Sequence, residues 1–245
     1  MSVTTHEAVG TAVSGEVSRV GNGTRYTRSY VLIGAIVGVV GVLLPVIFIV
    51  GEKFFLGGGW HVRGSISAYY HTSMRDVFVA GLCVTGFLLA TYRSGEPRKR
   101  EFWVSLISGV AVMGVVFFPT GRPGLQPGAP KCGVIPEPAG CSPIQQMFGE
   151  VPVATVHFGC ALVFILTLAA ICFVFASHEG NKASRVQIVC GVTIIAAVLG
   201  VIVGELMDVA LGELTPLYVG EVVSVWAFAV SWLNESVRAW RELRA

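Results

Sequence analysis

The sequence predicts an all-α fold, a polytopic membrane helix bundle with six transmembrane helices. Only 13% of the residues are charged and 53% are hydrophobic, whereas a soluble domain carries about 25% charged residues. Uncharged apolar runs recur along the chain, and about 20 helical residues cross a bilayer. The lipid bilayer is therefore the first expected partner. A net charge of +2 and the lack of a basic stripe interleaved with aromatic residues exclude nucleic acid as a partner.

The apolar runs divide the chain into three parts. Residues 1–28 are rich in Ser, Thr, Gly and Val and predict a flexible cytoplasmic tail, and residues 237–245 predict a short basic cytoplasmic tail. Residues 29–236 between them form the transmembrane domain. Helices are expected there, because a helix satisfies its own backbone hydrogen bonds in lipid and the runs do not alternate as barrel strands do. The six spans are expected at about 30–50, 76–92, 102–118, 152–176, 186–210 and 216–233.

The spans hold few ionisable side chains. The first and third spans have none, and Pro45 is expected to kink the first. The second span opens on Asp76, the fourth contains His157 and the sixth contains Glu221. The fifth span carries two carboxylates near its C-terminal end, Glu205 and Asp208.

The orientation follows from Lys and Arg, because cytoplasmic loops carry an excess of these residues. Twelve of the 17 fall in the two tails and in the second and fourth loops. The other five are Lys53, Arg63, Arg75, Arg122 and Lys131. Six spans return the C-terminus to the side of the N-terminus, in agreement with this distribution. We therefore expect a bacterial inner-membrane protein with both termini in the cytoplasm.

The third loop, about residues 119–150, is the one long loop on the outer side. It is rich in proline and contains Cys132 and Cys141, the only cysteines outside the apolar spans. Because the space outside the inner membrane is oxidising, a disulfide between them is expected. Two free thiols are the alternative.

The ionisable residues of the spans all fall in the outer half of the predicted bundle. Such groups are costly in a membrane and are retained where they pair or line a wet cavity. Glu205 and Asp208 are three residues apart and share a helix face. We therefore expect an outward-facing ligand pocket, with aromatic walls, formed by Ser67, Tyr69, Tyr70, His71, Arg75, Asp76, His157, Glu205, Asp208 and Glu221.

Within this pocket, Glu205 is expected to pair with Arg75 and to lie near His157, because Arg75 is the basic side chain at a matching depth. Several of these residues also have a purely structural interpretation. Arg75 would pair with a carboxylate to stabilise the bundle, Asp76 and Asp208 would lie among lipid headgroups, and His157 would be a hydrogen-bonded packing residue.

Three functions fit these residues. The leading hypothesis is a protein that binds a small or lipid-like ligand for transport, sensing or an accessory role. The second is a membrane-embedded enzyme that uses His157, Glu205, Asp208 and Glu221 as catalytic candidates. The third is a structural partner of another membrane protein. Zinc has only weak support as a cofactor, because the candidate ligands lie on separate helices and no HExxH or CxxC motif accompanies them.

Four short motifs carry a family resemblance. They are S-I-S-A-Y-Y at 65–70, R-D-V-F-V-A at 75–80, F-P-T at 118–120 and A-F-A-V-S-W-L at 227–233. With these motifs the chain resembles a broad group of uncharacterised bacterial multipass membrane proteins, with a departure at Ala80, where that group has glycine. The resemblance implies the membrane fold and the topology, and it implies no activity.

Overall fold

The computed structural model describes residues 6–56, 62–92, 99–126, 128–177, 183–209, 214–242 and 244. Within these residues every regular element is a helix, and no β-strand occurs. The elements are α1 (His6–Leu56), η1 (Ile66–His71), α2 (Arg75–Thr91), α3 (Arg100–Phe117), α4 (Pro143–Phe148), α5 (Glu150–Ser177), α6 (Ala183–Leu206) and α7 (Pro216–Glu242).

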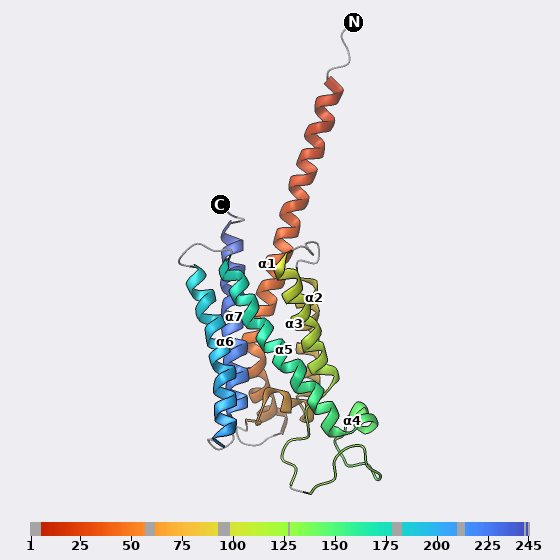
Figure 1. Cartoon of the computed structure of the whole chain (residues 1–245). Helices are drawn as coiled ribbons and strands as arrows, with labels where there is room; N and C mark the ends of the chain where they lie inside the picture. The colour runs from red at the N-terminus through yellow and green to blue at the C-terminus, as the bar shows by residue number, and fades with distance from the viewer. Residues whose placement is uncertain are drawn as a thin grey trace.

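The long helices form a bundle with both termini at one end (Figure 1). We call that end the inner end and the opposite one, where η1 and α4 lie, the outer end. Helix α3 packs against α2 and α5, and α7 packs against α6 and α1. Helix α5 also contacts α6. Helices α2 and α6 therefore lie on opposite sides of the bundle.

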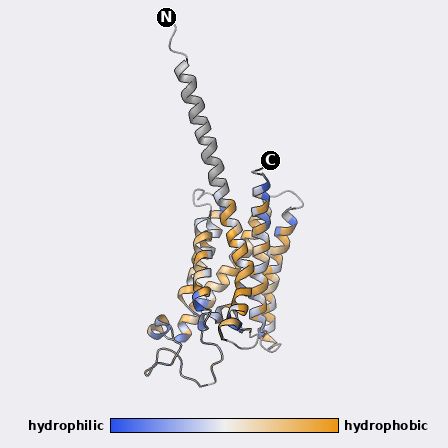
Figure 2. Ribbon diagram, turned by 180° about the vertical axis from the view of Figure 1, so that it is seen from behind, coloured by the Kyte–Doolittle hydropathy of each residue, from blue (hydrophilic) through white to orange (hydrophobic). Residues whose placement is uncertain are grey.

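The chain is a membrane-embedded protein. Five helical segments of the described residues are long and apolar enough to cross a membrane: Val31–Phe55, Arg100–Phe117, Glu150–Ser177, Arg185–Leu206 and Pro216–Arg241. Hydrophobic residues cover their length in Figure 2, and hydrophilic ones gather toward the ends. The helical bundle predicted from the sequence is confirmed. The expected second span corresponds to α2, whose 17 residues place it at the short limit of about 17–25 residues for a span.

Both predicted tails contain helix. The backbone of α1 is helical from His6 onward, within the segment expected to be flexible, and α7 continues to Glu242. Residues 1–5, 243 and 245 lie outside the described part of the chain. Extension of an existing helix adds one hydrogen bond per residue fixed, without a new nucleation cost. This explains why helices that contain a long apolar run extend into the polar sequence beside it.

Two aromatic clusters fix the two halves of the bundle. In the inner half, the Trp232 ring lies 4.9–5.3 Å from the ring centroids of Tyr92, Phe175 and Phe228. In the outer half, Phe48 stacks on Tyr69 with a 5.0 Å centroid separation. The second cluster seats η1 on the end of α1, which places the SISAYY motif inside the bundle.

Helices α2 and α3 approach closely enough to require glycine. A Cβ at Gly109 would lie 2.6 Å from the carbonyl oxygen of Gly86 and 2.7 Å from the backbone nitrogen of Ala90. Any larger residue at position 109 would separate the two helices. Small residues at helix contacts are typical of membrane bundles, where lipid offers no hydrophobic drive for association.

Candidate functional site

The η1 helix is a buried plug at the outer end of the bundle. Ser65 caps it, because its hydroxyl accepts a hydrogen bond from the Ala68 N–H at 3.0 Å. Two hydrogen bonds attach η1 and the preceding residue Gly64 to α7 and to the turn before α7. The Glu221 carboxylate accepts from the Ile66 N–H at 2.5 Å, and the Thr215 hydroxyl donates to the Gly64 carbonyl at 2.5 Å. This stretch, which precedes the expected second span, forms a 3-10 helix that is separate from α2.

Glu221 also lines a groove between α5, α6 and α7. The groove has a volume of about 250 Å³, and its walls are apolar apart from Glu221 and Ser224. Phe158 and Leu162 from α5 face Ile202 from α6 and Leu217 from α7 across it. Of the lining residues, Glu221 alone is ionisable. A single carboxylate at one wall of a hydrocarbon-like groove suits an amphiphilic ligand.

Arg75 does not meet Glu205. Its guanidinium lies 4.4 Å from the centroid of the Tyr70 ring and donates a 2.7 Å hydrogen bond to the Tyr70 hydroxyl. Glu205 is exposed in the last turn of α6, Asp208 is exposed in the turn after α6, and Asp76 is exposed in the first turn of α2. The expected pairing of Arg75 with Glu205 is wrong, because α2 and α6 lie on opposite sides of the bundle.

His157 is buried and fastens α5 to the end of α3. Its Nδ1 lies 2.7 Å from the carbonyl oxygen of Phe118 and 3.2 Å from that of Val115. Because both neighbours are acceptors, Nδ1 carries the proton. The Nε2 atom is buried with no hydrogen-bond partner among the described residues. This position matches the packing alternative for His157.

His71, the last residue of η1, contacts the loop that follows α3. Its Nε2 donates to the carbonyl oxygen of Thr120 at 2.7 Å. The same oxygen accepts from the Gln145 side chain at 2.9 Å. Burial lowers the pKa of His71, an effect that the Thr120 carbonyl and the Glu150 carboxylate partly oppose. The neutral imidazole is thus favoured.

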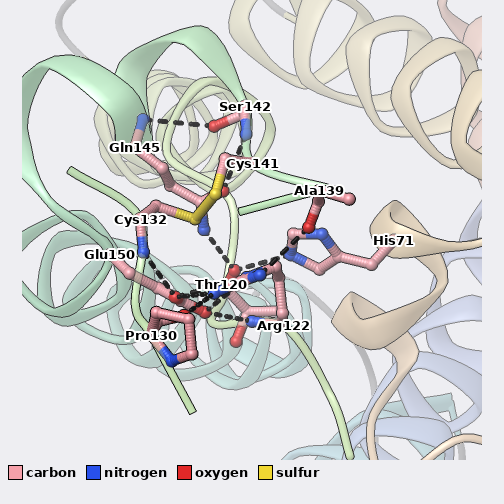
Figure 3. The surroundings of a disulfide bond; sticks show 10 residues. All are labelled: His71, Thr120, Arg122, Pro130, Cys132, Ala139, Cys141, Ser142, Gln145 and Glu150. Atoms are coloured by element: carbon pink, nitrogen blue, oxygen red, sulfur yellow. Dashed lines mark hydrogen bonds and ion pairs between the residues drawn. A yellow bond between two sulfur atoms is a disulfide. The ribbon is translucent and has the colours of Figure 1, made fainter. Parts of the chain in front are cut away.

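The loop that follows α3 forms a small unit, residues 119–126 and 128–149, which we call the outer lobe; Figure 3 shows the surroundings of its disulfide. Cys132 and Cys141 form a disulfide with a Cα–Cα separation of 5.7 Å, so the predicted pairing is confirmed. The short helix α4 begins with a capping box, in which the Ser142 hydroxyl and the Gln145 side chain each bond the other's backbone N–H. The disulfide therefore closes the lobe directly before a well-capped helix.

A buried ion pair organises the outer lobe. Arg122 donates to Glu150 Oε2 at 3.0 Å, and both side chains are almost fully buried. Glu150 also accepts from the backbone N–H of Arg122 at 2.7 Å and of Cys132 at 3.1 Å. The remaining Arg122 donors reach the carbonyl oxygens of Pro130 at 2.7 Å and Ala139 at 3.0 Å. One arginine thus holds three separate stretches of the loop together.

Sequence reasoning missed this ion pair and one other. Glu52, buried in the last turn of α1, accepts from Arg63 Nε at 2.9 Å and also pairs with the rest of that guanidinium. The same feature of the sequence could have indicated both ion pairs. Glu52 and Glu150 stand at the outer ends of long apolar helices, where an unpaired carboxylate is costly, and each has an arginine in the adjoining loop.

The catalytic candidates are not brought together. Glu221 lies in the groove, His157 lies against α3, Glu205 is exposed on α6, and Asp208 is exposed in the turn after α6. Within the described residues no group of three or more His, Cys, Asp and Glu side chains is arranged to hold a metal ion.

The chain matches no family model, no curated protein and no solved structure. The resemblance to bacterial multipass proteins therefore stays a prediction. Glu221 and its groove are the features from which a function can be argued.

Proposed function

We propose that the chain is a six-span membrane protein that binds a lipid-like ligand in the groove between α5, α6 and α7. In this proposal α2 also crosses the membrane and brings the number of spans from five to six, since 17 residues are enough for a thin or locally thinned bilayer. Both termini are cytoplasmic, because twelve of the 17 Lys and Arg residues belong to the tails and loops of the inner end. The binding serves transport, sensing or an accessory role.

The observation that carries the proposal is the Glu221 carboxylate in an apolar groove. An ionisable group inside a membrane costs about 2.5–3.5 kcal/mol at mid-depth, and such groups mark ligand or ion pathways. The Ile66 N–H occupies one acceptor site of Glu221, and an ionised carboxylate has about four. The carboxylate can therefore accept further hydrogen bonds from a ligand.

The walls of the groove define the rest of the ligand. A volume of about 250 Å³ is below the roughly 300–1,000 Å³ of sites for drug-sized molecules, and it suits one hydrocarbon chain. Phe158, Leu162 and Ile202 line the groove and are also exposed on the bundle surface. The groove thus opens sideways, toward lipid. The ligand class is an amphiphile with one apolar chain and a hydrogen-bond-donating or cationic head, such as an amine.

A photoreactive long-chain alkylamine tests the proposal. Reconstituted protein is cross-linked with this probe, or with the matching fatty acid, and the labelled peptides are mapped by mass spectrometry. The amine should label peptides of α5 and α6 that line the groove. Glu221→Gln should reduce this labelling at least tenfold, because the amide lacks the negative charge and a hydrogen bond to a charged group contributes about 1.5–3 kcal/mol.

Glu205→Gln is the matched control, because it removes an exposed carboxylate from the same end of the bundle outside the groove. It should leave labelling unchanged. Equal labelling by the amine and the fatty acid, or equal labelling of wild type and Glu221→Gln, would refute the proposal.

A further inference from the structure

The outer lobe carries an apolar surface that no described part of the chain covers. Ile135 is 100% exposed, Met147 is 76% exposed and Phe148 is 61% exposed. Val134 and Val151 are also exposed. We call these five residues, four from the outer lobe and Val151 from α5, the lobe patch. Exposed apolar residues that gather in one place mark an interaction site.

Backbone contacts bring the two halves of the lobe patch together. A Cβ at Gly133 would lie 3.1 Å from the Cα of Gly149, so the chain at Gly133 packs directly on the end of α4. The Glu150 N–H donates to the Cys132 carbonyl at 3.3 Å. The backbone that leads into Val134 and Ile135 therefore lies against the end of α4, directly after Met147 and Phe148.

The lobe is built so that these side chains cannot fold inward. The Cys132–Cys141 disulfide spans the turn that carries Val134 and Ile135. The interior of the lobe is filled by polar groups, namely the Arg122–Glu150 ion pair and the Gln145 side chain, which is fully buried. An apolar side chain displaced inward would break these hydrogen bonds.

The lobe patch continues into the membrane surface of the bundle. Only Gly149 separates α4 from α5, which begins at Glu150 and is apolar enough to span a membrane. Val151, in the first turn of α5, is exposed and links Phe148 to the exposed apolar residues farther along that helix. Residues 133–136 and 143–149 contain no Asp, Glu, Lys or Arg.

We propose that the lobe patch inserts into the lipid leaflet at the outer end of the bundle. The acyl region of the bilayer is its occupant, because the patch is uncharged and continuous with a lipid-facing helix. Lys131 and Glu137, both exposed, flank the patch and reach the headgroups. The outer lobe thus lies on the membrane as an interfacial anchor beside α5.

The test places an environment-sensitive NBD fluorophore on Met147→Cys, with Glu137→Cys as the matched control on the polar flank. The four free cysteines, Cys83, Cys160, Cys172 and Cys190, are replaced by alanine in both chains. In nanodiscs holding one chain each, the label at 147 should emit at shorter wavelength and be quenched at least threefold more by acyl-nitroxide lipid than the label at 137.

Hydroxyl-radical footprinting of the unaltered chain provides a second readout that needs no substitution. Met147 should be oxidised severalfold more slowly in nanodiscs than in the same protein unfolded in denaturant. Water-like emission at 147 with rapid Met147 oxidation would overturn the proposal. Emission that shifts only when two chains share a disc would also overturn it, and would assign the patch to a second copy of the chain.

Discussion

Glu221 on α7 accepts a hydrogen bond from the backbone N–H of Ile66, the first residue of η1, across 155 positions of sequence. The first N–H groups of a helix lack a partner within the helix, so this carboxylate caps η1 from outside. The same side chain lines the groove. The proposed ligand site and the position of η1 therefore share one residue.

The cap predicts a difference between two substitutions. Glu221→Ala should lower stability by about 1–3 kcal/mol, because it leaves the buried Ile66 N–H unsatisfied. Glu221→Gln keeps a carbonyl oxygen for that N–H and should lose less than half as much. Thermal unfolding in detergent measures both. Identical melting of the two variants and the wild type would show that the bond contributes no stability.

The Arg122–Glu150 pair should behave as a coupled unit. Arg122→Met and Glu150→Gln should each cost about 3–5 kcal/mol, because each leaves a buried charge without its partner. The double variant should cost clearly less than the sum of the two. The comparison cycle is Arg75→Met with Glu205→Gln, which should be additive within about 0.3–0.5 kcal/mol, since the two residues share no contact. Additivity in the first cycle would contradict the ion pair.

The proposed orientation can be tested by cysteine labelling in cells. A cysteine at Glu137 in the outer lobe should react with a membrane-impermeant maleimide in intact cells. A cysteine at Ser177, exposed at the inner end of α5, should react only after permeabilisation. The four free cysteines lie within helices of the bundle and provide the background rate. Labelling of position 177 in intact cells would reverse the proposed orientation.

His71 predicts a dependence of stability on pH. Because burial lowers the pKa of His71 in the folded state, the unfolded chain binds the proton more readily. Stability should therefore fall as the pH drops below the unperturbed value of about 6.5, and level off below the folded-state pKa. His71→Gln keeps a donor for Thr120 and does not titrate. Its melting temperature should approach or exceed that of the wild type as the pH is lowered from 8 to 5, and a constant difference would contradict the prediction.

The helical bundle was predictable because hydropathy is a local property of each run, and lipid leaves few alternatives to helix. The Cys132–Cys141 disulfide was predictable because these two cysteines stand apart from the apolar spans. Hydropathy determines the number of spans less clearly than it determines the helical fold. The motif at 65–70 forms η1, which is separate from α2, and the 17 residues of α2 lie near the limit for crossing.

The contacts between helices were not predictable from the same reasoning. Matching depths of Arg75 and Glu205 give one coordinate, along the membrane normal, and say nothing of the side of the bundle on which each helix lies. Tyr70, five positions before Arg75, provides the actual partner. Likewise, Arg122 in the adjoining loop was a recognisable partner for Glu150, but the donation from the Cys132 N–H depends on how the loop folds.

The carbonyl oxygen of Thr120 accepts from His71 on one side and from Gln145 on the other. A carbonyl oxygen has two lone pairs, and here both accept a hydrogen bond. This single atom therefore connects η1 to the outer lobe. A ligand head that drew Glu221 away from Ile66 would loosen η1, and the pull would reach the lobe through Thr120. If the groove binds a ligand as proposed, its occupancy would then change how the lobe is held at the outer end of the bundle, and η1 would transmit that change.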